Sequence, residues 1–88
     1  MYMLNRKEIF ELINIERDKQ DKKWGALPRH LSDMVWLTIL IEEVGECAQA
    51  ILKRDWGNLK TEIIQVATVA IAWLEDSENH SNGSYKVG

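Results

Sequence analysis

The segment from Ile63 to Leu74 restricts the fold more than any other part of the chain. All twelve of its residues except Gln65 and Thr68 are apolar, so on a helix the apolar side chains would cover nearly the whole circumference. The run is shorter than the roughly 18 to 20 residues of a membrane-spanning helix. It is also long for a strand, because no turn signal interrupts it. We therefore expect a helix that is buried on more than one side, and no membrane partner.

Start and stop signals divide the rest of the chain. Asn5 followed by Glu8 has the spacing of a capping box, which predicts a first helix running to about Lys22. A polar segment over residues 23–33, which contains Pro28, then interrupts the helical pattern.

Two further helices follow this segment. Ser32 or Asp33 can cap a second helix over residues 34–54. Residues 55–58, with the sequence Asp-Trp-Gly-Asn, supply the stop signal of that helix and the cap of the next. The third helix is expected over residues 59–76.

The length of the chain limits how much core it can build. We expect one helical domain over residues 1–76 and a disordered tail over residues 77–88, which offer almost nothing apolar to bury. A domain of this size buries only about 60% of its unfolded surface, and Cys47 is the only cysteine, so no intrachain disulfide can add stability. We therefore predict an all-α bundle of about three main helices that is completed by homo-oligomerisation, as a homodimer or homotetramer.

The charge balance limits the partners. Eleven basic and fourteen acidic side chains give a net charge of -3, so binding of nucleic acid through bulk positive charge is not expected. A single cysteine, with neither a signal peptide nor a Cys/His cluster, indicates a reducing, cytoplasmic compartment. Cys47 is then most simply a small buried hydrophobic residue.

Carboxylates interrupt the apolar stripes of the second and third helices. A helical projection places Glu43 and Glu46 on the apolar arc of the second helix, and Glu62 and Gln65 on that of the third. Burying carboxylates costs several kcal/mol each, and no lysine or arginine shares these arcs in mid-helix. A divalent cation would resolve the conflict, and ligands that are all oxygen favour Mg²⁺ or Mn²⁺. The alternative is that these glutamates lie at the edge of the bundle and reach water.

A family resemblance rests on the same residues. Residues 42–46 (Glu-Glu-Val-Gly-Glu) and 62–65 (Glu-Ile-Ile-Gln) are similar to the EExxE…ExxD signature of the MazG-like, all-α nucleoside triphosphate pyrophosphohydrolases, over about residues 8–76. The resemblance implies hydrolysis between the α and β phosphates of a nucleoside triphosphate with Mg²⁺, which releases a monophosphate and pyrophosphate.

The resemblance also implies roles for single residues. Glu43, Glu46 and Glu62 match metal ligands by position. Gln65 stands where the signature has aspartate, so a neutral carbonyl oxygen replaces a charged ligand and binds metal more weakly. Glu42 either supports the metal ligands without touching the ion, or orients the attacking water, or is simply solvated.

Candidate substrate-binding residues lie around the first loop and the end of the second helix. Gln20, Lys23 and Trp24 combine an aromatic face with polar and cationic groups that suit a base and phosphates. The alternative is that Trp24 packs against the bundle and the lysine is solvated. Arg54 projects along the arc of Glu43 and would neutralise triphosphate charge, or it only complements the helix dipole.

Two further interpretations of the chain compete with an enzyme. One is a non-catalytic helical oligomerisation or interaction module, in which Gln65 marks a degenerate metal site. The other is a regulatory nucleotide binder without turnover. Trp36 and Trp73 are expected in the core, and Trp56 is left between the core and base stacking.

Overall fold

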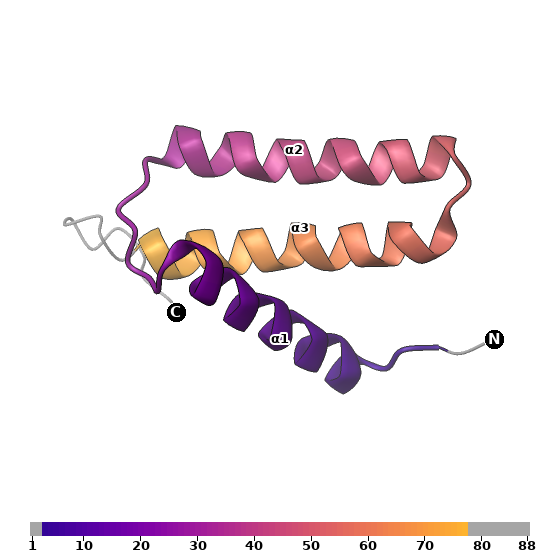
Figure 1. The fold of residues 1–88 in the computed structure, drawn as a ribbon, viewed down its shortest axis with the longest axis horizontal. Coiled ribbons are helices and arrows are strands. Elements are labelled where there is room, and N and C mark those ends of the chain that lie inside the picture. Colours follow the sequence, from indigo (N-terminus) through magenta and orange to yellow (C-terminus); the bar gives the residue numbers. More distant parts are fainter. Residues whose placement is uncertain (1–2, 78–88) are drawn as a thin grey trace, which may run out of the picture.

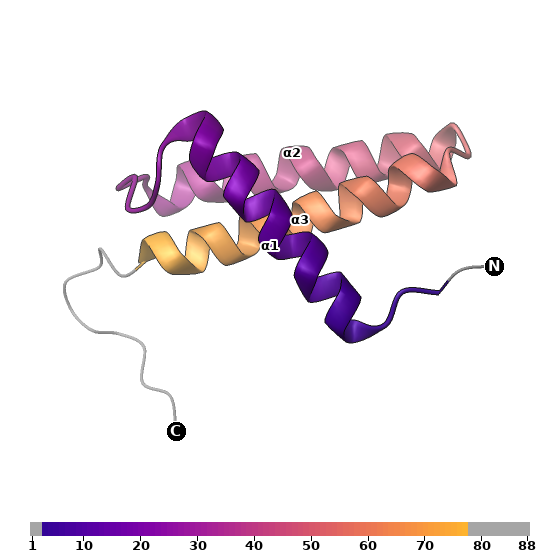
Figure 2. The same cartoon turned by 60° about the horizontal axis from the view of Figure 1, so that its bottom comes forward.

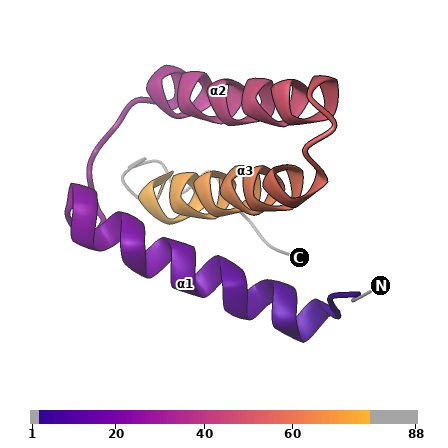
Figure 3. The same cartoon turned by 45° about the vertical axis from the view of Figure 1, so that its right-hand side comes forward.

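Three α-helices make up the protein in a computed structural model that describes residues 3–77, and this part of the chain contains no strand. The helices are α1 (Arg6–Trp24), α2 (Asp33–Leu52) and α3 (Trp56–Asp76). α2 and α3 run antiparallel as a hairpin, and α1 crosses α3 obliquely (Figures 1 and 2). α3 therefore lies between the other two helices (Figure 3). This arrangement confirms the expected all-α fold and explains why the sequence of α3 is apolar on several sides.

The predicted capping box forms at the start of α1. The backbone N–H of Glu8 donates to Oδ1 of Asn5 at 2.9 Å, and the backbone N–H of Asn5 donates to Oε1 of Glu8 at 3.0 Å. α1 continues to Trp24, slightly beyond the expected end, and stops at Gly25, whose φ of 92° suits a residue without a side chain.

The turn between α2 and α3 is shorter than expected. α2 ends at Leu52, and Arg54 adopts a φ of 56°, which ends the helical path. Asp55 is the N-cap of α3, because its Oδ1 accepts from the backbone N–H of Asn58 at 3.1 Å. Trp56 and the two residues after it therefore form the first turn of α3 instead of a break, and the predicted start at Leu59 is wrong by most of a turn.

The core lies where α2 and α3 pack against each other. Trp36, Val69 and Ala72 form its buried cluster. Partly buried apolar side chains from the first loop and from both helices surround the cluster: Leu27, Leu31, Ile39, Leu40 and Trp73. Trp36 and Trp73 thus lie in or against the core as predicted, whereas Trp56 is 57% exposed.

Asp76, at the end of α3, connects that helix to the first loop. Its carboxylate, in a residue that is 2% exposed, accepts hydrogen bonds from the backbone N–H groups of Arg29, His30 and Leu31 and from Nε1 of Trp36, at 2.7–3.1 Å. Burial by itself raises the pKa of Asp76, but these hydrogen bonds outweigh it and lower the pKa from 3.8 to about 2. A charged side chain buried at the end of the core therefore fixes the path of the loop.

A second apolar face of α2 points away from the core. Its exposed side chains follow helical spacing and consist of Met34, Leu37, Ile41, Val44 and Ile51, which we call the outer stripe. On α3, Ile63 and Leu74 are also more than half exposed. The sequence predicted that copies of the chain associate through α3, but the larger exposed apolar surface lies on α2.

None of α1, α2 and α3 combines the length and the hydropathy that crossing a membrane requires. Ser77, the first residue of the expected tail, is the C-cap of α3, and the rest of that tail lies outside the described residues.

Candidate metal centre and adjoining cavity

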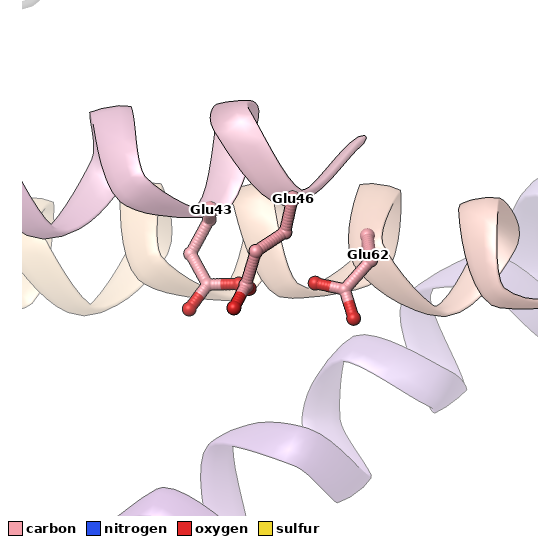
Figure 4. A group of neighbouring side chains, drawn as sticks. All are labelled: Glu43, Glu46 and Glu62. Atoms are coloured by element: carbon pink, nitrogen blue, oxygen red, sulfur yellow. The ribbon is translucent and has the colours of Figure 1, made fainter. Parts of the chain in front are cut away.

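Three glutamates from two helices converge at one place. Glu43 and Glu46 lie one turn apart on α2, and Glu62 lies on the part of α3 that faces them (Figure 4). One carboxylate oxygen from each residue lies within 4.8 Å of the others. Glu43 and Glu62 are partly buried and Glu46 is exposed. The sequence left open whether these glutamates are buried inside the bundle or reach water at its edge, and the trio is intermediate between the two.

Two oxygens of this trio lack partners. Oε2 of Glu43 and Oε2 of Glu62 are buried and accept no hydrogen bond. None of the ion pairs found within residues 3–77 includes a member of the trio. A buried oxygen without a partner is unfavourable, and a carboxylate oxygen is the kind of ligand that a hard divalent cation prefers. The residues that are present therefore fit such a cation.

The raised pKa values of Glu43 and Glu62 are also consistent with a cation site. Burial raises the pKa of Glu43 to about 7, and the neighbouring carboxylates of Glu46 and Glu62 add to this rise. The pKa of Glu62 is also raised, first by burial and then by Glu46. A bound cation would favour the ionised form of both carboxyl groups, so Glu43 would release its proton when the cation binds.

A cavity of about 840 Å³ adjoins the trio. α1, the first loop and α2 form its sides, and α3 contributes to its wall. The lining residues are Glu16, Lys19, Gln20, Lys23 and Trp24 of α1, Arg29 and Leu31 of the loop, Trp36, Ile39, Glu42 and Glu43 of α2, and Gln65 and Val69 of α3. Glu43 therefore belongs both to the trio and to the cavity.

The structure brings most of the predicted substrate residues together here. Gln20, Lys23 and Trp24 line the cavity, and Trp24 is 64% exposed instead of packed into the bundle. The ammonium group of Lys23 lies 4.8 Å from the centre of the Trp24 ring. Glu42, the candidate for orienting water, is exposed and lines the same cavity.

Arg54 lies apart from these residues. The projection that aligned it with Glu43 assumed that α2 reaches residue 54, but this helix ends at Leu52. Arg54 follows the helix in a left-handed conformation and is absent from the cavity lining.

Sequence reasoning missed Glu16, Lys19 and Arg29 of the cavity wall. Glu16 and Lys19 lie three or four residues from Gln20 and Lys23. On a helix they share a face with those two candidates, so helical spacing could have predicted them as neighbours. Arg29 had no such signal, because it belongs to an irregular loop. Its Nε donates to the backbone oxygen of Gly25 at 3.1 Å, which ties the side chain to the end of α1.

Gln65 reaches across to α1. Its Nε2 donates to Oε2 of Glu16 at 2.7 Å, and both residues line the cavity together with Glu43. Cys47 is partly buried next to the trio, and its pKa is raised, first by burial and then by the charges of the three glutamates. The site thus combines a carboxylate cluster, an amide, lysines and an exposed aromatic ring.

Comparison of the chain with protein-family models, with curated proteins and with solved structures finds no match. The assignment of a function therefore depends on the site itself.

Proposed function

We propose that this protein is a Mg²⁺-dependent nucleoside triphosphate pyrophosphohydrolase that converts a canonical or modified (d)NTP to the (d)NMP and pyrophosphate, in a housecleaning or pool-control role in the cytoplasm. The observation that carries the proposal is the glutamate trio, with two buried oxygens that lack partners, next to a large cavity. The resemblance of residues 42–46 and 62–65 to the MazG-like signature supports the same function.

The carboxylates would hold the metal. Glu43, Glu46 and Glu62 provide charged oxygens for Mg²⁺ or Mn²⁺, and Gln65 provides a neutral carbonyl oxygen. The cation, when bound, neutralises phosphate charge and makes the α phosphorus more electrophilic.

The remainder of the cavity suits a nucleotide. Its volume of about 840 Å³ lies within the usual range of small-molecule sites. Lys19 and Lys23 would attract the triphosphate, the exposed ring of Trp24 would stack on the base, and Gln20 would form hydrogen bonds with it.

In the proposed reaction, a water oxygen bonds to the α phosphorus. The bond from that phosphorus to the oxygen that bridges the α and β phosphates breaks, and pyrophosphate leaves with that oxygen. We assign Glu42 to orienting the water and accepting its proton, because it lines the cavity and is the residue next to Glu43.

Product analysis tests this proposal. The protein is incubated with a panel of NTPs and dNTPs and with Mg²⁺ or Mn²⁺, and the monophosphate, pyrophosphate and orthophosphate are quantified separately. We expect equal amounts of monophosphate and pyrophosphate, and no turnover by Glu43→Ala. Glu11→Gln, which changes an exposed glutamate of α1 outside the cavity lining, is the matched control and should remain active. Absence of turnover by the wild type across the panel would refute the proposal.

A second candidate function is a non-catalytic oligomerisation or interaction module. The observation that favours it is the outer stripe of α2, because contiguous exposed apolar side chains commonly mark an association surface. The same assay separates the two candidates. If the wild type is inactive and Gln65→Asp gains turnover, the site has kept its geometry and lost catalysis, and binding becomes the better assignment.

A further inference from the structure

The hydrogen bond between Gln65 and Glu16 fixes the direction of an amide. Nε2 of Gln65 donates to Oε2 of Glu16 at 2.7 Å. An ionised carboxylate can only accept, so an amide rotated by 180° would bring two oxygen atoms against each other. Glu16 thereby determines which end of the amide turns toward α1 and leaves the carbonyl oxygen as the end available to a cation.

Glu16 is itself held in place. Its other oxygen, Oε1, accepts from Nζ of Lys19 at 3.3 Å, and its side chain is 23% exposed. Glu16, Gln65 and Glu43 all line the same cavity. A negative charge therefore lies one hydrogen bond away from the neutral amide of Gln65, on a different helix.

We propose that Glu16 is a positioning residue of the metal centre, which orients the Gln65 carbonyl oxygen and supplies from α1 the negative charge that the amide lacks. The inference rests on the proposed function, because it assigns Glu16 a role toward the cation bound there. It also makes α1 part of the metal centre, although the three glutamate ligands all come from α2 and α3. A carboxylate that bonds to a ligand group in this way polarises it and restricts its rotation.

A double-mutant cycle in metal binding tests the proposal. MnCl₂ alone, without nucleotide, is titrated by calorimetry into the wild type, Glu16→Gln, Gln65→Asp and the double variant. We expect Glu16→Gln to weaken Mn²⁺ binding by about ten-fold, as is typical when a group that orients a ligand is lost. In the Gln65→Asp background there is no amide to orient and the ligand carries its own charge, so there Glu16→Gln should weaken Mn²⁺ binding clearly less than ten-fold.

Glu11→Gln, on the same helix, serves as the matched control and should bind Mn²⁺ as the wild type does. Circular dichroism establishes that each variant is folded. Equal weakening by Glu16→Gln in both backgrounds would indicate a merely structural role and overturn the proposal, as would wild-type affinity in Glu16→Gln or no Mn²⁺ binding by the wild type. Pyrophosphate release decides the function separately: a protein that shows this cycle but hydrolyses no nucleotide would keep the inference and lose the proposed activity.

Discussion

At the scale of single residues, Glu43 combines a partly buried carboxyl group with two carboxylate neighbours, Glu46 and Glu62. Its raised pKa means that the ionised form is disfavoured in the folded protein. In the metal-free protein the free energy of unfolding therefore falls as the pH rises above the ordinary pKa of 4.5. The loss is complete above about pH 7, where the partly buried Glu43 is ionised beside two other carboxylates. The same charge would be required to hold a cation. Ionisation of Glu43 would therefore favour metal binding while it destabilises the metal-free protein.

Glu43→Gln should therefore change stability in opposite directions with and without metal. At pH 8 without metal we expect the variant to be more stable than the wild type by roughly 1 kcal/mol, because burying a neutral amide costs less than burying a charge and the amide is not repelled by Glu46 and Glu62. With excess Mg²⁺ the wild type should gain thermal stability and the variant should not. Differential scanning calorimetry in EDTA and in Mg²⁺ measures both effects, and an equal Mg²⁺ response in the two proteins would refute the role of Glu43.

The pKa of Asp76 is lowered, so its ionised form stabilises the folded protein, in contrast to that of Glu43. Its folded pKa, about 2, lies below the ordinary value of 3.8, so its contribution to stability is complete above about pH 4 and is lost as the pH falls through 2. Asp76→Asn, which cannot accept from all of these donors, should cost on the order of 2 kcal/mol at pH 7.

Urea unfolding of the wild type and Asp76→Asn between pH 2 and pH 7 checks this prediction. The two stabilities should converge toward pH 2, because protonated aspartate also loses its charge. A difference that stays constant over this range would mean that the effect is one of packing and not of ionisation.

The sequence was sufficient to find the glutamate trio and insufficient to find the partners of Gln65 and Asp76. Glu43 and Glu46 share a face of one helix by local geometry alone, and Glu62 meets them because a short turn makes α2 and α3 antiparallel neighbours. The bonds from Gln65 to Glu16 and from Asp76 to the loop depend on how distant segments pack. No spacing in the sequence encodes that packing.

At the scale of helices, polar side chains contribute to the attachment of α1 to α3. Arg17 is 7% exposed, and its guanidinium donates to Oε1 of Glu75 at 2.8 Å and to Oδ1 of Asp21 at 3.0 Å. Within α1, only Ile13 accompanies it as a buried residue. Arg17 is therefore an anchor of α1 that the amphipathic pattern of this helix did not predict.

We expect Arg17→Ala to lower the free energy of unfolding by about 1–3 kcal/mol, because it removes charge-assisted hydrogen bonds and the packing of a buried side chain. Lys19→Ala, at a side chain that is 69% exposed, should change it by less than about 0.5 kcal/mol. Urea denaturation followed by circular dichroism measures both. If the two substitutions have equal effects, Arg17 is not an anchor.

The helix ends show how capping chemistry limits prediction. Asn5 and Ser32 cap α1 and α2 as their side chains predict. Asp55, Gly57 and Asn58 all suit a turn or a cap, and the sequence alone did not show which of them begins α3. The hydrogen bond from the backbone N–H of Asn58 to Asp55 shows that Asp55, the first of the three in the chain, is the N-cap of α3. α2 correspondingly ends before Arg54.

At the scale of the whole molecule, the outer stripe of α2 remains exposed although α3 is flanked by two helices (Figure 3). The sequence predicted the uncovered apolar surface on α3, where only Ile63 and Leu74 of the apolar run over residues 63–74 are more than half exposed. The larger exposed surface is on α2, because α1 and α2 pack on different sides of α3, which the sequence did not show.

We expect the protein to self-associate and the outer stripe to be buried when it does. Ile41, which is 59% exposed, lies in the middle of this stripe. Ile41→Lys should shift the protein toward monomer, since a buried unpaired charge opposes association. Gln49→Lys adds the same charge on exposed α2 surface outside the stripe and is the matched control.

Light scattering over a dilution series reports the oligomeric state of all three proteins. A wild type that stays monomeric and fully folded at every concentration would refute self-association. Loss of association in both variants would mean that the added positive charge prevents association wherever it lies on α2, and the outer stripe would then not be identified as the interface.

The short connection between α2 and α3 has a consequence for how the chain folds. All three glutamates lie on this hairpin, whose contacts are close in sequence, and closing its loop costs little chain entropy. Helical pairs of this kind form quickly, whereas the bonds from α1 to the middle and the far end of α3 join segments that are distant in sequence. The carboxylates can therefore meet before α1 docks, so that a cation present during folding would find its ligands before the cavity for the nucleotide exists.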